Sequence, residues 1–383
     1  FVKQGTWVTK PTEMRDYLFM YERIIPEVLS EYDPDTFYWP ASPSSGGSFD
    51  EPNDPNRGDV HYWEVWHGNK PFSEYRKYFF RYASEFGFQS FPSVKTLETV
   101  TDDPKELNPF SYVMEKHQRN YGGNGKIAKY MQAAYRYPEN FSDFVYASQL
   151  LQADGIRYGV EHYRRNRGRC MGAIYWQLND CWPVISWSSI DYYGRWKAQH
   201  YFARQAYRDL LVSPIADEEG MLNIYVVSDR PASCSGTLDV KVIKLTGEII
   251  SDFRQTVKIA ANTSRKLFSI ELDKALKNIP KEDVFIYAQL TDKNKNIYSN
   301  QYFLVKQKEV NYPKVSITRD IKPVEGGFEV TLKSDYFARA VFLSTGDAES
   351  SFSDNYFDIL PGTPVSVVIY TVLSQSMLEK QLK

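Results

Sequence analysis

The amino-acid sequence predicts a mixed fold. An α/β part that forms the C-terminal half of a (β/α)8 TIM barrel is followed by two immunoglobulin-like β-sandwich domains. Strand-like and helix-like stretches alternate through about the first 212 residues, whereas short alternating apolar and polar stretches follow one another afterwards. All eight Trp and all five His lie at or before His200. This shift in composition indicates a domain boundary near residues 211–215.

The first part is predicted to contain helices that separate a small number of strands. Helical patterns cover residues 13–32, 140–166 and 196–211. Strand patterns cover residues within 33–47, 59–66, 78–89 and 170–180. Strands that alternate with helices form parallel sheets. A closed barrel has eight strands, so this part amounts to the second half of a barrel, with open sheet edges and exposed apolar faces.

The second part is predicted to form two antiparallel β domains. Period-two alternation occurs in LNIYVVSDR, GTLDVKVIKL, VFIYAQLTD and NIYSNQYFLV, a set that fits a sandwich of immunoglobulin-like size. The pattern starts again with KVSITRD, GGFEVTLKS, RAVFLST and PVSVVIY. The expected division is therefore a half barrel over residues 1–212, an immunoglobulin-like sandwich over 213–310 and a C-terminal β-sandwich over 311–383.

Charge and composition exclude several classes of partner. The net charge is −2 and no block of Lys and Arg occurs, so neither a nucleic acid nor an acidic membrane surface is an expected partner. No apolar run approaches the roughly 18 residues of a membrane span. The chain opens FVKQGTWVTK without an initial Met, which suggests a cut end, so the missing signal peptide carries no information about secretion.

The cysteines indicate neither a disulfide framework nor a zinc site. The three residues Cys170, Cys181 and Cys234 show no C-x-x-C spacing. So few cysteines favour a cytoplasmic location, while a periplasmic or lysosomal one stays open.

A single carboxylate, Glu85, stands between small and aromatic residues in the stretch YASEFGFQSFP. Two explanations are open. The carboxylate ends a strand and pairs with an arginine such as Arg81, or it acts as a nucleophile or general base. A carboxylate nucleophile is the usual means of cleaving a glycosidic bond with retention. The end of a barrel strand is also where this fold carries its active site.

Two further stretches suit a sugar. In IYWQLNDCWPVISWSSIDYYGRWK, the aromatic planes of residues such as Trp176 alternate with amides and carboxylates such as Asn179. A sugar has apolar ring faces and polar edges, which match this mixture. A packed strand end with capping Asn and Asp explains most of these residues equally well.

In RGDVHYWEVWHG, a strand would place His61, Trp63 and His67 on one face. Two histidines six residues apart match no zinc signature, so a metal site is not expected. These residues are explained better by histidines that donate hydrogen bonds to sugar hydroxyls and a tryptophan that packs against the sugar. Ser44 and Ser45 could also reach the site.

The same stretches resemble the β-mannosidases of glycoside hydrolase family 2. The resemblance rests on long motifs in the family's order and spans nearly the whole chain: GDVHYWEVWHG, SEFGFQSFPS, NYGGNGKI, RRNRGRCMGAIYWQLNDCWPVISWSSIDYYGRWKAQHYF and SFSDNYFDILPGTPV. The combination of ASEFGFQS with YWQLND favours the mannosidases over the galactosidases and glucuronidases of the family, which remain alternatives. A non-catalytic carbohydrate-binding module is a further alternative.

The resemblance implies an exo-acting retaining hydrolase that releases β-mannose from the non-reducing ends of oligosaccharides or glycans. It implies Glu85 as the nucleophile, Trp176 as the floor of the mannose subsite, and Trp63 and His67 as its lining. It implies no metal and no organic cofactor.

One departure from the family pattern concerns the general acid. The family's acid/base glutamate follows an Asn, and no Asn-Glu dipeptide occurs in this sequence. In the family's order that residue precedes Phe1, as do a sugar-binding sandwich and a first immunoglobulin-like domain. The expected partner of this chain is therefore the missing N-terminal part of the same protein, and the chain alone is expected to be inactive.

Overall fold

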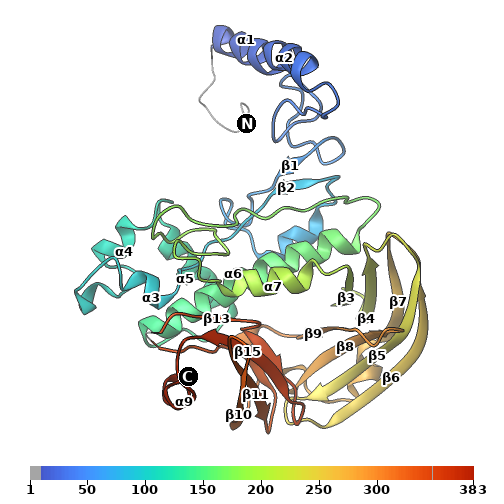
Figure 1. Cartoon of the computed structure of the whole chain (residues 1–383). Helices are drawn as coiled ribbons and strands as arrows, with labels where there is room; N and C mark the ends of the chain where they lie inside the picture. Colours follow the sequence, from blue (N-terminus) through green and yellow to red (C-terminus); the bar gives the residue numbers. More distant parts are fainter. Residues whose placement is uncertain (1–9, 347) are drawn as a thin grey trace. The chain divides into compact units, whose positions relative to one another are not determined.

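The structure is a computed structural model that describes residues 10–346 and 348–383. Figure 1 shows the helices and strands, coloured along the sequence. The chain divides into two compact units. The first unit comprises Phe1–Phe88 and Tyr158–Gln177, and the second comprises Gln89–Arg157 and Leu178–Lys383. The long helix α6 (Phe141–Arg165) contributes residues to both units, and it matches the helix predicted over residues 140–166.

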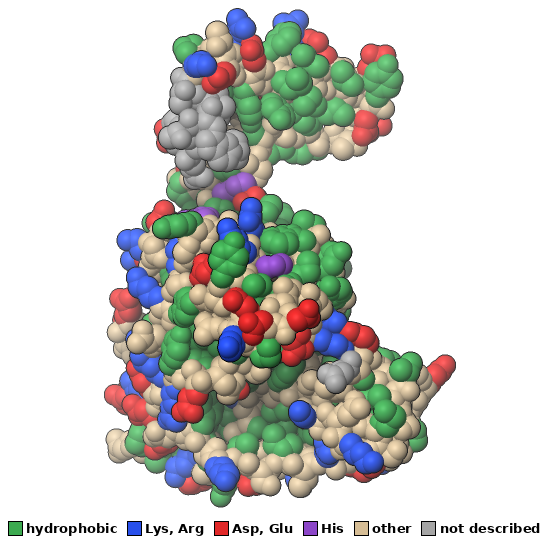
Figure 2. Space-filling model, turned by 90° about the vertical axis from the view of Figure 1, so that its left-hand side faces the viewer, with side chains coloured by type: hydrophobic (Ala, Val, Ile, Leu, Met, Phe, Trp, Pro, Cys, Tyr) green, Lys and Arg blue, Asp and Glu red, His purple; other side chains and the backbone are tan. Residues whose placement is uncertain are grey.

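The described part of the first unit begins with the helix predicted over residues 13–32. It consists of α1 (Pro11–Phe19), a π-helical stretch η1 (Met20–Ile24) and α2 (Ile25–Tyr32). A proline opens α1, where its missing N–H has no helical partner to lose. Large apolar side chains are exposed along this helical segment, as the space-filling view also shows (Figure 2); they include Phe19, Met20, Tyr21, Ile24 and Val28.

The first unit contains a short parallel sheet. Strand β1 (Val60–His61) pairs in parallel with β2 (Ala83–Glu85), and His61 lies opposite Glu85. A parallel bridge joins Ala83 to Ala173, so a third segment runs alongside β2. Farther along, the backbone N–H of Trp176 donates to the carbonyl oxygen of Phe86 at 2.8 Å. A 3-10 helix, η2 (Phe72–Lys77), connects β1 to β2.

The strand predicted over residues 59–66 is shorter than expected. After β1 the chain turns, and the N–H of His67 donates to the carbonyl oxygen of Trp63 at 2.7 Å. The turn buries the adjacent side chains of Val65 and Trp66, which an extended strand would point to opposite faces. The single strand face predicted for His61, Trp63 and His67 is therefore wrong.

Two other predicted strands do not form regular ladders in the described residues. Residues 33–47 contain only the isolated bridge of Ser44 to Asp59, and residues 170–180 contain only isolated bridges. Their backbone groups bond irregularly to neighbouring segments, as Met171 N–H does to the carbonyl oxygen of Arg81 at 2.8 Å.

Helices and long loops make up the first part of the second unit. Besides α6, they are α3 (Val94–Leu97), η3 (Pro104–Glu106), α4 (Tyr112–Lys116), α5 (Gly123–Ala134) and α7 (Ala198–Ala206). Helix α7 is shorter than the predicted helix over residues 196–211, because a β-strand begins at Leu210. The hydroxyls of Ser93 and Ser111 cap α3 and α4 by accepting from backbone N–H groups of the first turn.

A first β-sandwich follows, with antiparallel sheets on either side of an apolar core. One sheet has the order β3-β4-β7, with β3 (Leu210–Ala216), β4 (Met221–Ser228) and β7 (Thr263–Glu271). The other has the order β6-β5-β8-β9, with β5 (Cys234–Lys244), β6 (Ile249–Ile259), β8 (Val284–Asp292) and β9 (Ile297–Tyr302). Side chains such as Leu222, Val240 and Ile286 fill the core. Short helices α8 (Leu272–Leu276), η4 (Lys281–Asp283) and η5 (Gln307–Glu309) connect the strands or follow them.

A second, smaller sandwich ends the chain. Its larger sheet has the order β10-β11-β15-β13, with β10 (Ile317–Val324), β11 (Gly327–Ser334), β13 (Ser350–Phe352) and β15 (Val365–Thr371). Strands β12 (Ala338–Val341) and β14 (Phe357–Ile359) form the other sheet, and helix α9 (Gln375–Gln381) follows. Both sandwiches agree with the immunoglobulin-like domains predicted from the sequence.

An aromatic cluster joins the two sandwiches. Phe337, from the second sandwich, is 1% exposed and packs on Phe285 of β8, with ring centroids 4.3 Å apart. Its ring also lies 5.8 Å from that of Phe303. Buried apolar contact of this kind holds the two domains in one arrangement.

Replacing Phe337 by Ala should lower the free energy of unfolding by about 3–5 kcal/mol, because the change leaves a cavity at this junction. Denaturant unfolding of the purified protein measures the change. Val372→Ala is the control, since Val372 is 99% exposed and its truncation should change stability by less than about 0.5 kcal/mol. Equal midpoints for both variants would contradict the assigned packing.

Candidate active site

Glu85 ends strand β2 with its carboxylate half-buried. The indole N–H of Trp63 donates to Oε2 of Glu85 at 3.2 Å. The Nδ1 atom of His61 lies 3.2 Å from the same oxygen. Among the described residues, none makes a hydrogen bond or ion pair with Oε1, and no ion pair joins Glu85 to Arg81. The carboxylate is thus anchored through one oxygen, and the other is available.

The electrostatic surroundings of Glu85 favour its neutral form. Burial raises the pKa of its carboxyl group, the hydrogen bond from Trp63 lowers it, and the negative charge of Asp59 raises it again. The net direction is upward from the ordinary glutamate value. A raised pKa is common for carboxyl groups in active sites.

Asp59 lies next to this carboxylate and accepts four hydrogen bonds. Its Oδ1 accepts from the indole N–H of Trp39 and the backbone N–H of Ser44, both at 3.0 Å. Its Oδ2 accepts from the hydroxyls of Ser42 and Ser84, both at 2.5 Å. Burial opposes ionisation of Asp59, but the four hydrogen bonds outweigh burial and lower its pKa.

His61 lies between the two carboxylates. Its Nε2 is 2.8 Å from the hydroxyl oxygen of Ser42, and its Nδ1 faces Glu85. The side chain is 13% exposed. Both ring nitrogens are therefore engaged with protein atoms, which leaves neither for a sugar hydroxyl. Neither Asp59 nor Ser42 was expected from the sequence, although Asp59 precedes His61 by two residues, the spacing of a shared strand face.

The backbone of Trp176 and the indole ring of Trp63 lie close to Gly87, so only glycine fits there. A Cβ atom at this position would lie 2.4 Å from the carbonyl oxygen of Trp176 and 2.9 Å from the ring of Trp63. Trp176 is 44% exposed, so its ring is available to a ligand. The exposed ring of His67 lies 5.3 Å from that of Trp63, measured between ring centroids.

The predicted site residues thus fall into two groups. His61, Trp63, His67, Glu85 and Trp176 belong to the first unit. Asn179 belongs to the second, where its amide donates to the carbonyl oxygen of Asp180 at 3.2 Å.

The acidic residues of the Trp-rich stretch stabilise loops of the second unit. The carboxylate of Asp180 accepts from the hydroxyls of Ser186 and Ser188, each at 2.6 Å. Asp191 accepts from the hydroxyl of Thr96 at 2.5 Å. These bonds explain why the carboxylates are present without assigning them to a ligand.

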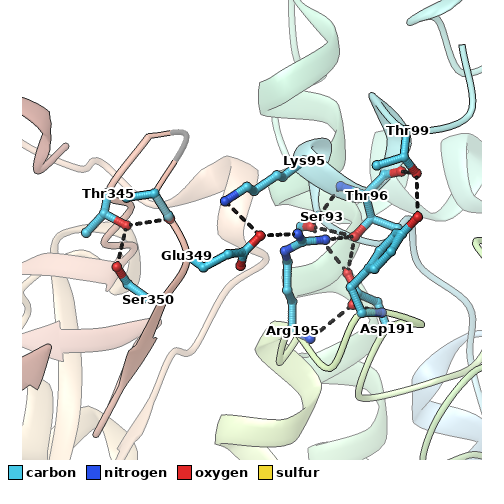
Figure 3. A network of polar contacts seen from close by, with 11 residues as sticks. Ser93, Lys95, Thr96, Thr99, Asp191, Arg195, Thr345, Glu349 and Ser350 are labelled. Carbon is cyan, nitrogen blue, oxygen red and sulfur yellow. Dashed lines mark hydrogen bonds and ion pairs between the residues drawn. The ribbon is translucent and has the colours of Figure 1, made fainter. Parts of the chain in front are cut away.

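A polar network connects this region to the second sandwich (Figure 3). Arg195 donates to the hydroxyl oxygen of Thr96 at 2.7 Å and pairs with Glu349 at 2.6 Å. Lys95 pairs with the same Glu349 oxygen at 3.0 Å. Hydrogen bonds from Arg195 and Lys95 lower the pKa of Glu349. The network is explained by domain docking.

No three His, Cys, Asp or Glu side chains within residues 10–346 and 348–383 gather as they would around a metal ion. Over the same residues, no helix has both the length and the apolar character needed to cross a membrane.

Two protein-family models match the second part of the chain. Residues 220–309 match a mannosidase Ig/CBM-like domain, and residues 311–383 match an Ig-fold domain of mannosidases.

Several known proteins are similar over most of the chain. A β-mannosidase from Capra hircus is 31% identical over 92% of this chain and 43% of its own length. A β-mannosidase B from Aspergillus terreus is 36% identical over 64% of this chain and 31% of its own length. The chain thus spans less than half the length of these curated relatives.

Solved structures agree with these similarities. The crystal structure of a β-D-mannosidase from Dictyoglomus thermophilum is 31% identical, with a TM-score of 0.85 over 95% of this chain and 44% of that one. An exo-chitosanase from Amycolatopsis orientalis, 18% identical with a TM-score of 0.62 over 88% of this chain and 44% of that one, shares the fold. Together, the domain matches and these similarities show that the chain belongs to the β-mannosidase family and corresponds to a C-terminal portion of its members.

Proposed function

We propose that this chain carries the nucleophile of a retaining exo-β-mannosidase of glycoside hydrolase family 2, which removes terminal β-mannose from the non-reducing ends of oligosaccharides or glycans. The observation that carries the proposal is the geometry of Glu85. Its carboxylate ends a parallel strand, is anchored through Oε2 and has Oε1 available. The relatives, which are named β-mannosidases, support the substrate class.

In the proposed reaction, Oε1 of Glu85 attacks the anomeric carbon while the glycosidic bond breaks. A general acid gives its proton to the departing oxygen, and a covalent glycosyl-enzyme forms. Water then releases mannose as the same acid group, now a base, takes a proton from the water. Trp176 is proposed to form the floor of the mannose subsite, with Trp63 and His67 as its lining.

The general acid is proposed to come from another segment of the full-length protein. Retaining enzymes place their two carboxyl groups roughly 5–5.5 Å apart. Relatives more than twice as long as this chain support a contribution from elsewhere. The exposed apolar side chains of α1 and α2, such as Phe19 and Val28, fit contact with that segment. On this basis, these 383 residues alone are proposed to be inactive on ordinary β-mannosides.

The proposed architecture follows from the same reasoning. Residues 1–212 are proposed to form the second half of a (β/α)8 barrel, and residues 213–310 and 311–383 the two sandwich domains. The parallel alignment of β1, β2 and the segment at Ala173, with active residues at the strand ends, supports the barrel.

Glu85→Gln in the full-length protein should reduce kcat by roughly 10⁴-fold or more, because the amide keeps the shape and removes the attacking charge. Aryl β-mannoside hydrolysis measures the loss, and a fluorinated mannoside that traps the glycosyl-enzyme should label Glu85. Glu64→Gln, which changes an exposed carboxylate in the neighbouring turn, is the control.

Wild-type activity of the Glu85 variant would refute the proposal, as a preference for galactosides would refute the mannoside assignment. Absence of any labelled carboxylate would favour a carbohydrate-binding module.

Trp176→Ala should lower kcat/KM by about 10-fold or more, since stacking of a flat ring on an aromatic side chain is worth roughly 1–3 kcal/mol. Trp176→Phe keeps an aromatic face and should recover much of this loss. Because Trp176 is 44% exposed, neither variant should unfold the protein. Equal losses in the two variants would argue against stacking.

Trp63→Phe should move the acid limb of the kcat/KM profile to higher pH. The indole N–H stabilises the carboxylate of Glu85, so its removal raises the pKa of Glu85 further, and the ionised nucleophile is lost earlier as the pH falls. The measurement is a pH series of kcat/KM for both enzymes. An unchanged acid limb would show that this hydrogen bond does not act on the titrating group.

A further inference from the structure

We propose that Asp59 controls the nucleophile Glu85 through a relay of two side chains, and that this relay makes His61 the proton acceptor for Glu85. The relay consists of Ser42 and His61. The inference rests on the proposed role of Glu85 as nucleophile, and it assigns to Asp59 a positioning role that acts at a distance from the sugar.

The direction of each hydrogen bond follows from the ionised state of Asp59. A carboxylate can only accept, so the hydroxyl of Ser42, 2.5 Å from Oδ2, must donate its single proton there. The oxygen of Ser42 is then free only to accept. The Nε2 atom of His61 lies 2.8 Å from that oxygen, so Nε2 must carry the N–H.

This arrangement leaves Nδ1 of His61 without a proton. A neutral imidazole carries one N–H, and the relay places it on Nε2. Nδ1 therefore presents a lone pair to Oε2 of Glu85 at 3.2 Å. Two lone pairs at this distance repel each other, so the contact is favourable only with one proton between the two atoms. That proton belongs to the Glu85–His61 pair as a unit.

The shared proton offsets the effect of burial on the carboxyl group of Glu85. Burial raises the pKa of Glu85 and so favours the neutral acid, which does not attack. Transfer of the proton from Oε2 to Nδ1 leaves a carboxylate and an imidazolium. Burial lowers the pKa of His61 to about 4, although the charge of Asp59 acts in the opposite direction. The imidazolium lies between two carboxylates, Glu85 on one side and Asp59, through Ser42, on the other.

The pair of Glu85 and His61 neither gains nor loses a proton overall in the proposed reaction. When Oε1 forms its bond to the anomeric carbon, Oε2 becomes the ester carbonyl oxygen and goes on accepting from Nδ1–H. When water releases the sugar, the carboxylate returns and the proton stays on Nδ1. His61 thus acts as a base that Asp59 orients through Ser42. Other sites with an activated nucleophile use the same arrangement.

Two serines provide a matched test. The hydroxyls of Ser42 and Ser84 lie at the same distance from Oδ2 of Asp59, but only the Ser42 hydroxyl contacts His61. In the full-length enzyme, Ser42→Ala should lower kcat about 10–100-fold with little change in KM, the usual scale for losing an orienting partner. The loss for Ser84→Ala should be much smaller. Equal losses in the two variants would overturn the relay.

Asp59→Asn removes the negative charge of the side chain and keeps its shape. The N–H groups of Trp39 and Ser44 hold the amide oxygen at the Oδ1 position, so the amide NH2 faces the serines. Ser42 can then donate to Nε2, and His61 becomes a donor to Glu85. The hydrogen bonds survive in the reverse direction, but His61 is then a neutral donor. It stabilises the departing carboxylate of Glu85 less than an imidazolium does when water releases the sugar. The proposal expects a loss of kcat similar to that of Ser42→Ala, and wild-type kcat would overturn it.

A double-mutant cycle shows whether Asp59 acts through His61. In a His61→Ala background, Asp59→Asn should cause no further loss of kcat, because the relay is already broken. A further loss as large as in the wild type would overturn the proposal. Glu85→Gln distinguishes this inference from the proposed function. If that variant is inactive while Ser42→Ala and Asp59→Asn keep wild-type kcat, only the relay is refuted.

Discussion

The pairing of β1 with β2 is the constraint on which the candidate site depends. Parallel register sets His61 opposite Glu85, and the backbone N–H of Tyr62 donates to the carbonyl oxygen of Glu85 at 2.7 Å. A shift of one residue would point the Glu85 side chain to the other face of the sheet. The turn that begins at Trp63 then brings the indole N–H back to the same carboxylate oxygen.

Burial of charge sets the chemistry at this sheet. A carboxylate that loses water must be compensated by hydrogen bonds or it becomes neutral. Asp59 is compensated fully, with two donors on each oxygen, and its pKa is lowered. Glu85 is compensated on one oxygen only, and its pKa is raised. When the pKa values of two nearby carboxyl groups are shifted in opposite directions, the two groups can take different chemical roles.

The two sandwiches serve a different purpose. Their cores are apolar and close on themselves, and the aromatic junction at Phe337 and the ion pairs of Glu349 fix them to neighbouring parts of the second unit. Polar residues of the Trp-rich stretch, such as Asp191 and Arg195, make hydrogen bonds that hold loops together. An acidic or basic residue beside a tryptophan is therefore weak evidence for a binding site until its partners are known.

The sequence by itself determined the long helices and both sandwiches, because these depend on local periodicity along the chain, and its motifs predicted a special role for Glu85. It did not determine that β1 ends at His61, since the burial of Val65 and Trp66 by a turn is a tertiary effect. Nor did it identify Asp59 and Ser42 as neighbours of His61. Ser42 is 17 residues from Asp59 in sequence, and a contact over that separation exists only once the loop has folded onto the sheet. The tertiary structure alone decided which oxygen of Glu85 is held and which is left available, because that depends on where two side chains from another strand and its turn come to lie.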